Sequence, residues 1–123
     1  MKIFELSKDG AQKIAKGVRE LYPRDMGDSI KSSVPGEWVL LKNTRKNKLF
    51  LAFVNPLSIN NPVAHILHEV DEKSVSNDEE EFFRLLQTSI IKRNFFKGYE
   101  SCARLVYGNA DNLPGLIVDS YVN

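Results

Sequence analysis

The chain has 123 residues, of which 42% are hydrophobic and 27% are charged, and its formal net charge is +1. These values are typical of a folded globular protein with one domain, or with one small domain and an attached piece. A single cysteine, Cys102, excludes an internal disulfide framework and a cysteine-cluster metal site. The polar start MKIFELSKDG lacks the apolar run of a signal peptide, and no stretch approaches the ~20 apolar residues of a membrane span. We therefore expect a cytoplasmic protein that does not contact membranes.

The first 70 residues predict a small domain with a highly curved sheet. KIFEL (2–6) alternates and predicts a short strand. Residues 8–22 carry apolar side chains at helical spacing and predict an amphipathic helix, which Gly17 weakens and Pro23 ends. The segments EWVLLK (37–42) and LFLAFV (49–54) flank a polar stretch and predict a hairpin, and residues 63–70 alternate again. We expect one core, complete in itself, inside a curved sheet or pseudo-barrel.

A polar linker at 71–77 leads to a helix predicted at 78–96. Ser76 and Glu79 have the spacing of a capping box, and acidic residues crowd the first turn. The apolar side chains of this helix cluster on one side, which must pack on something: Phe82, Phe83, Leu86, Ile90 and Ile91. The predicted fold class is therefore α+β.

The last segment predicts a β-hairpin, with strands at 103–107 and 116–121. Leu113-Pro114-Gly115 suits a type II turn, because Pro has a fixed φ and Gly supplies a positive φ. Two strands alone are marginal in water and leave unpaired edges. We interpret the hairpin as the opening of a larger sheet, and expect the chain to be a fragment of a longer protein.

No residue pattern predicts catalysis. His65 and His68 fall on opposite faces of one predicted strand, so we do not expect them to share a metal. Cys102 precedes a strand and has no histidine near it in sequence, which favours a buried structural thiol. The glycines of GNADNLPG do not have the spacing of a phosphate-binding loop. We predict no catalytic residue, no cofactor-binding residue and no metal ligand in this chain.

Basic residues are concentrated in the first half. Residues 1–70 hold eleven Lys and Arg against seven Asp and Glu, whereas residues 71–123 hold six against nine. If the first helix packs beside the curved sheet, its basic side chains and those of the 37–54 hairpin could form one positive stripe for a phosphate backbone. The alternative is that these lysines only solvate an exposed helix face.

The stretch RLVYGNADNLPGLIVDSY (104–121) closely resembles the signature of a family of PUA-containing, S-adenosylmethionine (SAM)-dependent ribosomal RNA cytosine-C5 methyltransferases. The order of elements before it is also similar to that family. The resemblance implies a PUA-like RNA-binding domain at 1–70, a linker and amphipathic helix at 71–98, and a hairpin at 99–123 that begins the methyltransferase region. The SAM site and the catalytic cysteine of the family lie in a following domain, and Cys102 does not match that cysteine. We therefore expect this chain alone to be inactive.

The same resemblance implies that RNA lies in a groove beside the first helix, where Gly17 would let a phosphate approach closely. We predict ribosomal RNA, not DNA, as the partner, with these contact residues: Lys13, Lys16, Gly17, Arg19, Arg24, Lys42 and Arg45. Two alternatives stay open. One is a complete RNA-binding module that forms a homodimer through the C-terminal hairpin. The other is a protein-interaction domain whose contact surface is the apolar face of the second helix.

Overall fold

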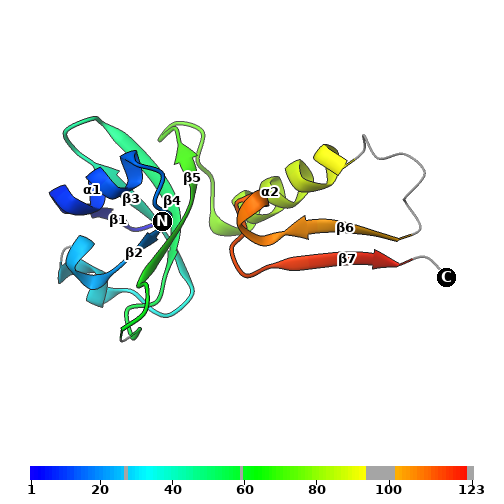
Figure 1. Ribbon diagram of the computed structural model, residues 1–123. Coiled ribbons are helices and arrows are strands. Elements are labelled where there is room, and N and C mark those ends of the chain that lie inside the picture. The colour runs from blue at the N-terminus through cyan, green and yellow to red at the C-terminus, as the bar shows by residue number, and fades with distance from the viewer. Residues whose placement is uncertain (27, 59, 94–101, 122–123) are drawn as a thin grey trace. The chain divides into compact units, whose positions relative to one another are not determined.

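The computed structural model in Figure 1 describes residues 1–26, 28–58, 60–93 and 102–121. The chain divides into two compact units, Met1–Val75 (unit 1) and Ser76–Asn123 (unit 2). Unit 1 contains a strongly curled five-stranded sheet, and unit 2 contains a two-stranded sheet beside a helix. The predicted α+β class with a curved sheet and a hairpin is confirmed. None of the described helices is long and apolar enough to cross a membrane.

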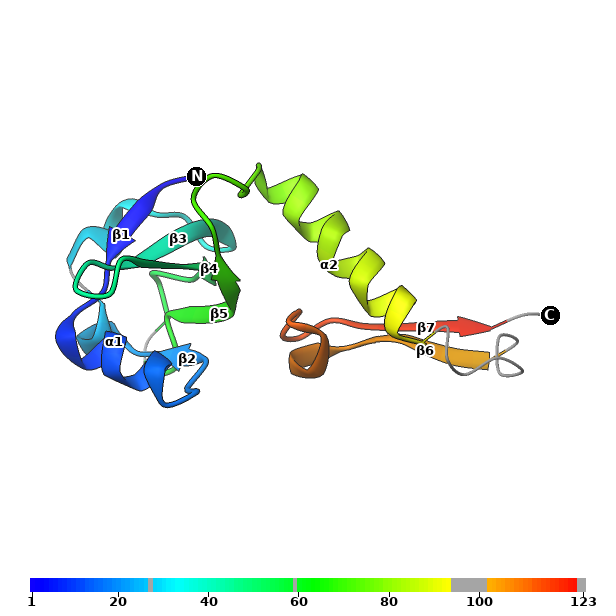
Figure 2. The same cartoon turned by 90° about the horizontal axis from the view of Figure 1, so that it is seen from above.

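The sheet of unit 1 has the strand order β1-β3-β4-β5-β2. Its elements in chain order are β1 (Ile3–Glu5), α1 (Lys8–Ala15), β2 (Glu20–Leu21), the 3₁₀ turns η1 (Pro23–Asp25) and η2 (Asp28–Ser32), β3 (Glu37–Asn43), β4 (Lys48–Val54) and β5 (Ala64–Val70). β1 runs parallel to β3, and the other neighbouring strands are antiparallel. Figure 2 shows the sheet curling around its interior.

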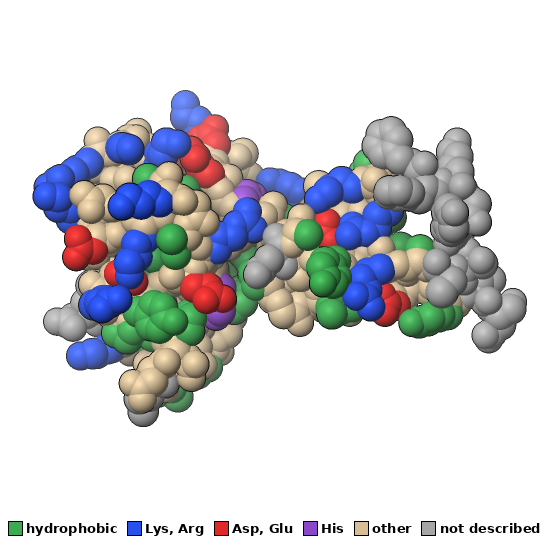
Figure 3. Space-filling view, in the orientation of Figure 1, with side chains coloured by type: hydrophobic (Ala, Val, Ile, Leu, Met, Phe, Trp, Pro, Cys, Tyr) green, Lys and Arg blue, Asp and Glu red, His purple; other side chains and the backbone are tan. Residues whose placement is uncertain are grey.

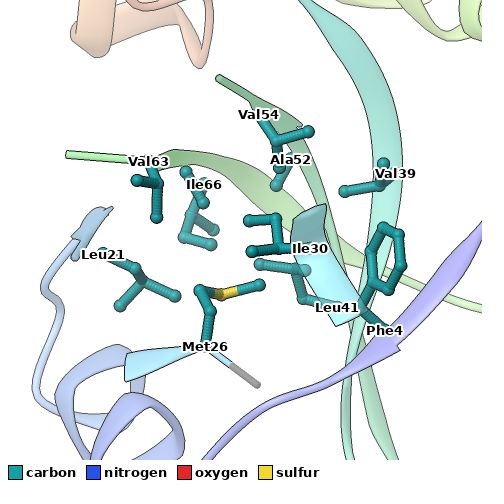
Figure 4. Close-up of a cluster of buried hydrophobic side chains, with 11 residues drawn as sticks. Phe4, Leu21, Met26, Ile30, Val39, Leu41, Ala52, Val54, Val63 and Ile66 are labelled. Atoms are coloured by element: carbon teal, nitrogen blue, oxygen red, sulfur yellow. The ribbon is translucent and has the colours of Figure 1, made fainter. Parts of the chain in front are cut away.

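The concave face of this sheet encloses the core of unit 1. Alternation along β3 and β4 directs one set of side chains inward, and the segments before β3 cover them. The close-up in Figure 4 shows these side chains converging. The buried cluster consists of Phe4, Leu21, Met26, Ile30, Val39, Leu41, Ala52, Val54, Val63, Ala64 and Ile66. The predicted core is present, and Ile14 of α1 packs against it.

The first helix is shorter than the sequence predicts. α1 ends at Ala15, not at residue 22, because Gly17 has a φ of +88° and turns the chain. The N–H of Gly17 donates to the carbonyl of Ile14 (2.9 Å), and the N–H of Val18 donates to that of Lys13 (3.0 Å). This pair of bonds is a Schellman motif, in which glycine relieves the steric penalty of the left-handed conformation. The chain then continues into the short strand β2.

A β-bulge in β5 places both histidines on one face of the sheet. His65 is opposite Phe53 and His68 is opposite Leu51, two residues of β4 that share a face. The register shifts between Leu51 and Ala52, so β5 contains one extra residue. The prediction that the histidines lie on opposite faces is therefore wrong. His65 stacks on Phe53 with ring centroids 4.9 Å apart.

Unit 2 consists of a helix and a hairpin. Its elements are α2 (Asp78–Arg93), β6 (Cys102–Tyr107), the 3₁₀ turn η3 (Gly108–Asp111) and β7 (Ile117–Tyr121). β6 and β7 are antiparallel, as predicted, and α2 packs against β6 and η3. Residues 94–96, the predicted last turn of the helix, lie outside the described residues, as does the side chain of Cys102.

The start of α2 differs in detail from the prediction. The side-chain oxygen of Asn77, not Ser76, caps the helix by accepting from the N–H of Glu80 (3.0 Å). Glu81, not Glu79, reaches back and accepts from the N–H of Ser76 (2.9 Å). The same turn of the helix is capped, but the cap begins one residue later than the spacing predicts.

The buried face of α2 also differs from the predicted apolar side. The buried residues are Glu81, Leu85 and Ser89, which recur every four residues. By contrast, Phe83 is 54% exposed, Ile90 is 42% exposed and Ile91 is 63% exposed. Leu85 is buried, as are Val106 of β6 and Leu113 of the hairpin loop. Much of the apolar surface of α2 is therefore open to solvent.

Candidate nucleic-acid interface

α1 forms a ridge between two hollows on the surface of unit 1. The first, which we call the Lys16 hollow, measures about 220 Å³ and is lined by Asp9, Gln12, Lys13, Lys16, Arg24 and Asp25. The second, the Arg45 hollow, measures about 240 Å³ and is lined by Lys8, Ala11, Gln12, Ala15, Asn43, Arg45 and Lys46. Because Gln12 lines both, the helix separates them. Figure 3 shows Lys and Arg side chains gathered over this part of unit 1.

The structure brings some of the predicted contact residues together and separates others. Lys13, Lys16 and Arg24 meet in the Lys16 hollow, and Arg45 lies on the other side of α1. Lys42 instead lines a third, wider hollow of about 630 Å³, where the acidic Glu69, Asp71 and Glu72 are also present. Arg19 is exposed and precedes β2, and its carbonyl accepts from the N–H of Ile66 (2.8 Å). Cationic side chains therefore line both sides of α1, whereas the surroundings of Lys42 are mixed in charge.

Asp25 fastens α1 to η1 from beneath the surface. Its side chain is 1% exposed, and Lys13 Nζ lies 2.8 Å from both of its carboxylate oxygens. The N–H of Tyr22 also donates to this carboxylate (2.9 Å). The backbone carbonyl of Asp25 accepts from the N–H (3.2 Å) and the hydroxyl (2.8 Å) of Ser7. One buried residue thus positions the start of α1 and the ammonium group of Lys13.

The pKa of Asp25 shows which of these interactions dominates. Burial would raise this pKa, but the hydrogen bonds from Lys13 and from the backbone of Tyr22 together outweigh burial, so the pKa lies below its ordinary value. Asp25 is therefore ionised at neutral pH and neutralises Lys13. The ammonium group of Lys13 is therefore used within the protein, to bind Asp25. Lys16 is exposed and presents its charge to solvent.

Gly10 allows the close approach between α1 and Asp25. It is the buried residue of α1, and an added Cβ would collide with the carbonyl oxygen of Asp25. Its N–H donates to the hydroxyl of Ser7 (3.0 Å), which caps the helix. The sequence carries a signal for this junction, because Ser7 is a favoured N-cap residue and Pro23 followed by Asp25 is typical of a helix start.

Gly17 forms an accessible turn at the end of α1. It is exposed, and a Cβ added to it would meet nothing within 4 Å. The space beside this backbone is therefore open, as the predicted close approach of a phosphate requires. Lys16 and Arg19 flank the turn on either side.

The exposed lining of the Arg45 hollow is almost entirely nonpolar, although three of its lining residues are cations. Ala11 and Ala15 of α1 provide methyl groups, and the turn between β3 and β4 provides Arg45 and Lys46. Asn43 is 8% exposed, and its side-chain oxygen accepts from the N–H of Lys46 (3.4 Å), which shapes the turn. Sequence reasoning did not single out Gln12 and Asn43. The only signal was the position of Asn43, at the end of a predicted strand before a polar loop.

Unit 2 has a buried carboxylate of its own. Asp111 is 1% exposed at its side chain and accepts a bidentate pair of bonds from Arg93 (3.1 and 2.7 Å). It also accepts from Lys92 Nζ (3.0 Å) and from the N–H of Tyr107 (2.7 Å). The bond from Arg93 is the largest of the effects that hold the pKa of Asp111 well below its usual range. This aspartate thus ties the last turn of α2 to the hairpin loop.

The other distinctive residues of 104–121 also have structural roles. The guanidinium of Arg104 pairs with Asp119 across the hairpin (2.7 and 3.1 Å) and lies 5.4 Å from the ring centroid of Tyr107. The N–H of Leu116 donates to the carbonyl of Leu113 (3.1 Å), and Gly115 has a φ of +82°. The predicted type II turn is therefore confirmed. This motif builds the hairpin: Arg104 and Asp119 pair with each other, and Asp111 pairs with Arg93 and Lys92 of α2.

Comparison with known proteins finds similarity in fold. The sequence matches no protein-family model, and it matches no curated protein. Among solved structures, a candidate SAM-dependent methyltransferase from Streptococcus mutans is similar over 99% of this chain and 31% of its own, with 23% identity and a TM-score of 0.65. A crystal structure of a candidate methyltransferase complexed with S-adenosylhomocysteine matches 99% of this chain and 30% of its own, with 22% identity and a TM-score of 0.66. The chain thus has the fold of about a third of these proteins.

Proposed function

We propose that unit 1 is a PUA-like RNA-binding domain and that the chain is part of a SAM-dependent ribosomal RNA cytosine-C5 methyltransferase. The observation that carries the RNA-binding proposal is the placement of Lys16, Arg24 and Arg45 in two hollows along α1. Such a cationic ridge attracts a phosphate backbone, and each contact releases counterions. The exposed glycine turn beside Lys16 adds a place where a phosphate can meet the backbone directly.

The methyltransferase part of the proposal has two supports. The first is the signature-like stretch 104–121, which forms the hairpin of unit 2. The second is the fold similarity over 99% of this chain to candidate methyltransferases. RNA held by unit 1 would be presented to a catalytic domain supplied by the rest of such a protein.

The described residues do not fit the SAM cofactor. The helix starts at Ser7 and Asn77 are not preceded by a glycine-rich turn from a strand, which is the usual site for a nucleoside cofactor. The two hollows along α1 are lined by several cations, which suits an anion better than the cationic sulfonium of SAM. We therefore assign no step of methyl transfer to the residues of this chain.

The test is the salt dependence of binding to a structured RNA. Lys16→Glu and Arg45→Glu should each weaken binding and make the slope of log K against log salt shallower by about 1. Lys73→Glu is the matched control, because it makes the same charge change beside Glu69, Asp71 and Glu72. Lys13→Glu is avoided, since an acid there would face the buried Asp25.

Binding that is absent, or that has the same salt slope in all of these variants, would contradict the RNA-binding proposal. If only Lys73→Glu made the salt slope shallower, the RNA contact surface would be the hollow that contains Lys42 instead.

A second candidate function is self-association through unit 2. The exposed apolar side chains of α2 are accompanied by exposed residues on the hairpin, where Tyr107 is 54% exposed, Ile117 is 55% exposed and Tyr121 is 73% exposed. Sedimentation equilibrium distinguishes this candidate. A dimer that Phe83→Lys and Tyr121→Lys convert to a monomer, without RNA binding, would favour it over the first proposal.

A further inference from the structure

Three hollows lined by described residues of unit 1 differ in the kind of ligand that they suit. The Lys16 hollow includes Asp9 and Asp25 among its lining residues, and the hollow around Lys42 includes three acids. The Arg45 hollow has no acid among its lining residues, which are three cations, two amides and two alanines. Its exposed lining is almost entirely nonpolar, so these cations line it through their hydrocarbon stems and can present their charged ends only at its rim.

We propose that the Arg45 hollow holds one unpaired nucleotide of the RNA, with its base inside and its flanking phosphates on the rim. This inference rests on the proposed RNA-binding function and adds the structural class of RNA that unit 1 selects. A continuous duplex keeps its bases stacked inside, so it could use only the rim. A bulged or looped-out nucleotide could use the rim and the floor together.

The floor suits the flat face of a base. Ala11 and Ala15 are one helical turn apart, so their methyl groups lie side by side on α1. Alanine is the smallest side chain that still offers an apolar contact, and its presence at both positions keeps the hollow open. A base covering these methyl groups would remove apolar surface from water.

The remaining lining residues extend the nonpolar surface. Gln12 lines the hollow from α1 and Asn43 from the end of β3, and polar atoms contribute almost nothing to the exposed lining. The side-chain oxygen of Asn43 is engaged by the N–H of Lys46, so this amide is held in place by the β3–β4 turn.

The rim positions cations for the phosphates on either side of that base. Lys8 lies in the first turn of α1, and Arg45 and Lys46 of the β3–β4 turn line the same hollow. A guanidinium donates two parallel hydrogen bonds to phosphate oxygens, and lysines attract phosphate with little dependence on orientation. The strand entering and the strand leaving the hollow would each meet a cation.

The experiment compares two RNA hairpins of the same length, one with a single bulged nucleotide in its stem and one with a fully paired stem. We expect the full chain to bind the bulged hairpin about threefold to tenfold more tightly, which is the gain from removing about 30 to 55 Å² of nonpolar surface from water. Ala15→Leu fills the hollow while keeping all charges, and should abolish this preference without changing the salt slope. Ala15→Ser leaves the hollow open and should keep the preference.

Thermal unfolding of both variants checks that unit 1 is intact, since Ala15 is an exposed residue at the end of α1. Salt-dependent binding with equal affinity for the two hairpins, or a preference that survives Ala15→Leu, would overturn the nucleotide site and leave the RNA-binding proposal standing. Failure to bind either hairpin would overturn both.

Discussion

Two buried aspartates, one in each unit, organise the surfaces that surround them. Asp25 joins α1 to η1 through Lys13, Tyr22 and Ser7, and Asp111 joins α2 to the hairpin through Arg93, Lys92 and Tyr107. In both cases a carboxylate removed from water receives charged and backbone donors, the condition under which a buried charge is tolerated. Lys13, Lys92 and Arg93 are therefore bonded to a buried aspartate, whereas Lys16 faces solvent.

The contact between Gly10 and Asp25 predicts a strong effect of a single methyl group. Gly10→Ala should lower the free energy of unfolding of unit 1 by about 1–3 kcal/mol, because the new Cβ must displace the carbonyl of Asp25. Denaturant unfolding followed by the fluorescence of Trp38, the single tryptophan, measures this change. Gln12→Ala, at an exposed site on the same helix, should change the value by less than about 0.5 kcal/mol. Equal values for the two variants would contradict the packing described for Gly10.

The lowered pKa of Asp25 predicts a dependence of stability on pH. The folded state binds fewer protons than the unfolded state at this site, so the contribution of Asp25 is present above its ordinary pKa of 3.8 and is lost as pH falls below that value towards the lower pKa of the folded state. Asp25→Asn should lower stability at pH 7 by about 1–3 kcal/mol, because it leaves Lys13 without its partner. The difference between the two proteins should shrink towards pH 3. A difference that is constant from pH 7 to pH 3 would contradict the ion pair.

At the scale of elements, the sequence predicts β1, β3, β4, β5 and the final hairpin, because alternation and turn residues are local signals. It misses features that depend on partners distant in the chain. α1 stops at Ala15 because Gly17 enters the left-handed conformation, and the run of apolar residues up to Leu21 belongs to a helix and then a strand. The bulge that places His65 and His68 on one face arises from pairing with β4, which no local pattern reveals.

The candidate surface was only partly predictable for the same reason. Lys16, Arg24 and Arg45 could be chosen as basic residues near the first helix, and the structure places all three along α1. Nothing in the local sequence distinguishes Lys13, which a buried aspartate twelve residues away neutralises. Nor does it show that Asn43 and Gln12 line the hollow that contains Arg45.

The hairpin of unit 2 offers a comparison between a buried and an exposed aspartate. Asp111→Ala should destabilise unit 2 by about 3 kcal/mol, because Arg93 and Lys92 lose a shared buried partner. Asp119→Ala removes an exposed pair with Arg104 and should cost less than about 1 kcal/mol. Hydrogen exchange of the amides in residues 102–121 measures both changes. Equal protection in the two variants would contradict the role of Asp111 in joining α2 to the hairpin.

At the scale of the whole molecule, the two units have different roles in the proposed function. Unit 1 contains a closed core and presents the cationic ridge, whereas unit 2 has a two-stranded sheet and exposed apolar side chains on α2. Two-stranded sheets gain stability from further strands or from packing partners. The chain also spans only 30–31% of the solved structures that it matches. In the proposed methyltransferase, unit 2 would connect the RNA-binding domain to the catalytic part.

This division predicts the size of the protein in its source cell. An antibody against residues 1–70 should detect a band well above the mass of 123 residues on a denaturing gel of whole lysate. A band only at the mass of this chain would contradict the methyltransferase proposal. That result would not bear on RNA binding by unit 1, which the salt-dependence and NMR experiments test.

The most direct test of the central proposal maps the contact surface by NMR. The backbone amide signals of the full chain would be followed during titration with a structured RNA at moderate salt. We predict that the largest shifts occur in α1, in the turn from Lys16 to Arg19 and in the β3–β4 turn around Arg45. Shifts confined to α2 and the hairpin, or no shifts at all, would contradict the assignment of the α1 ridge as an RNA-binding surface.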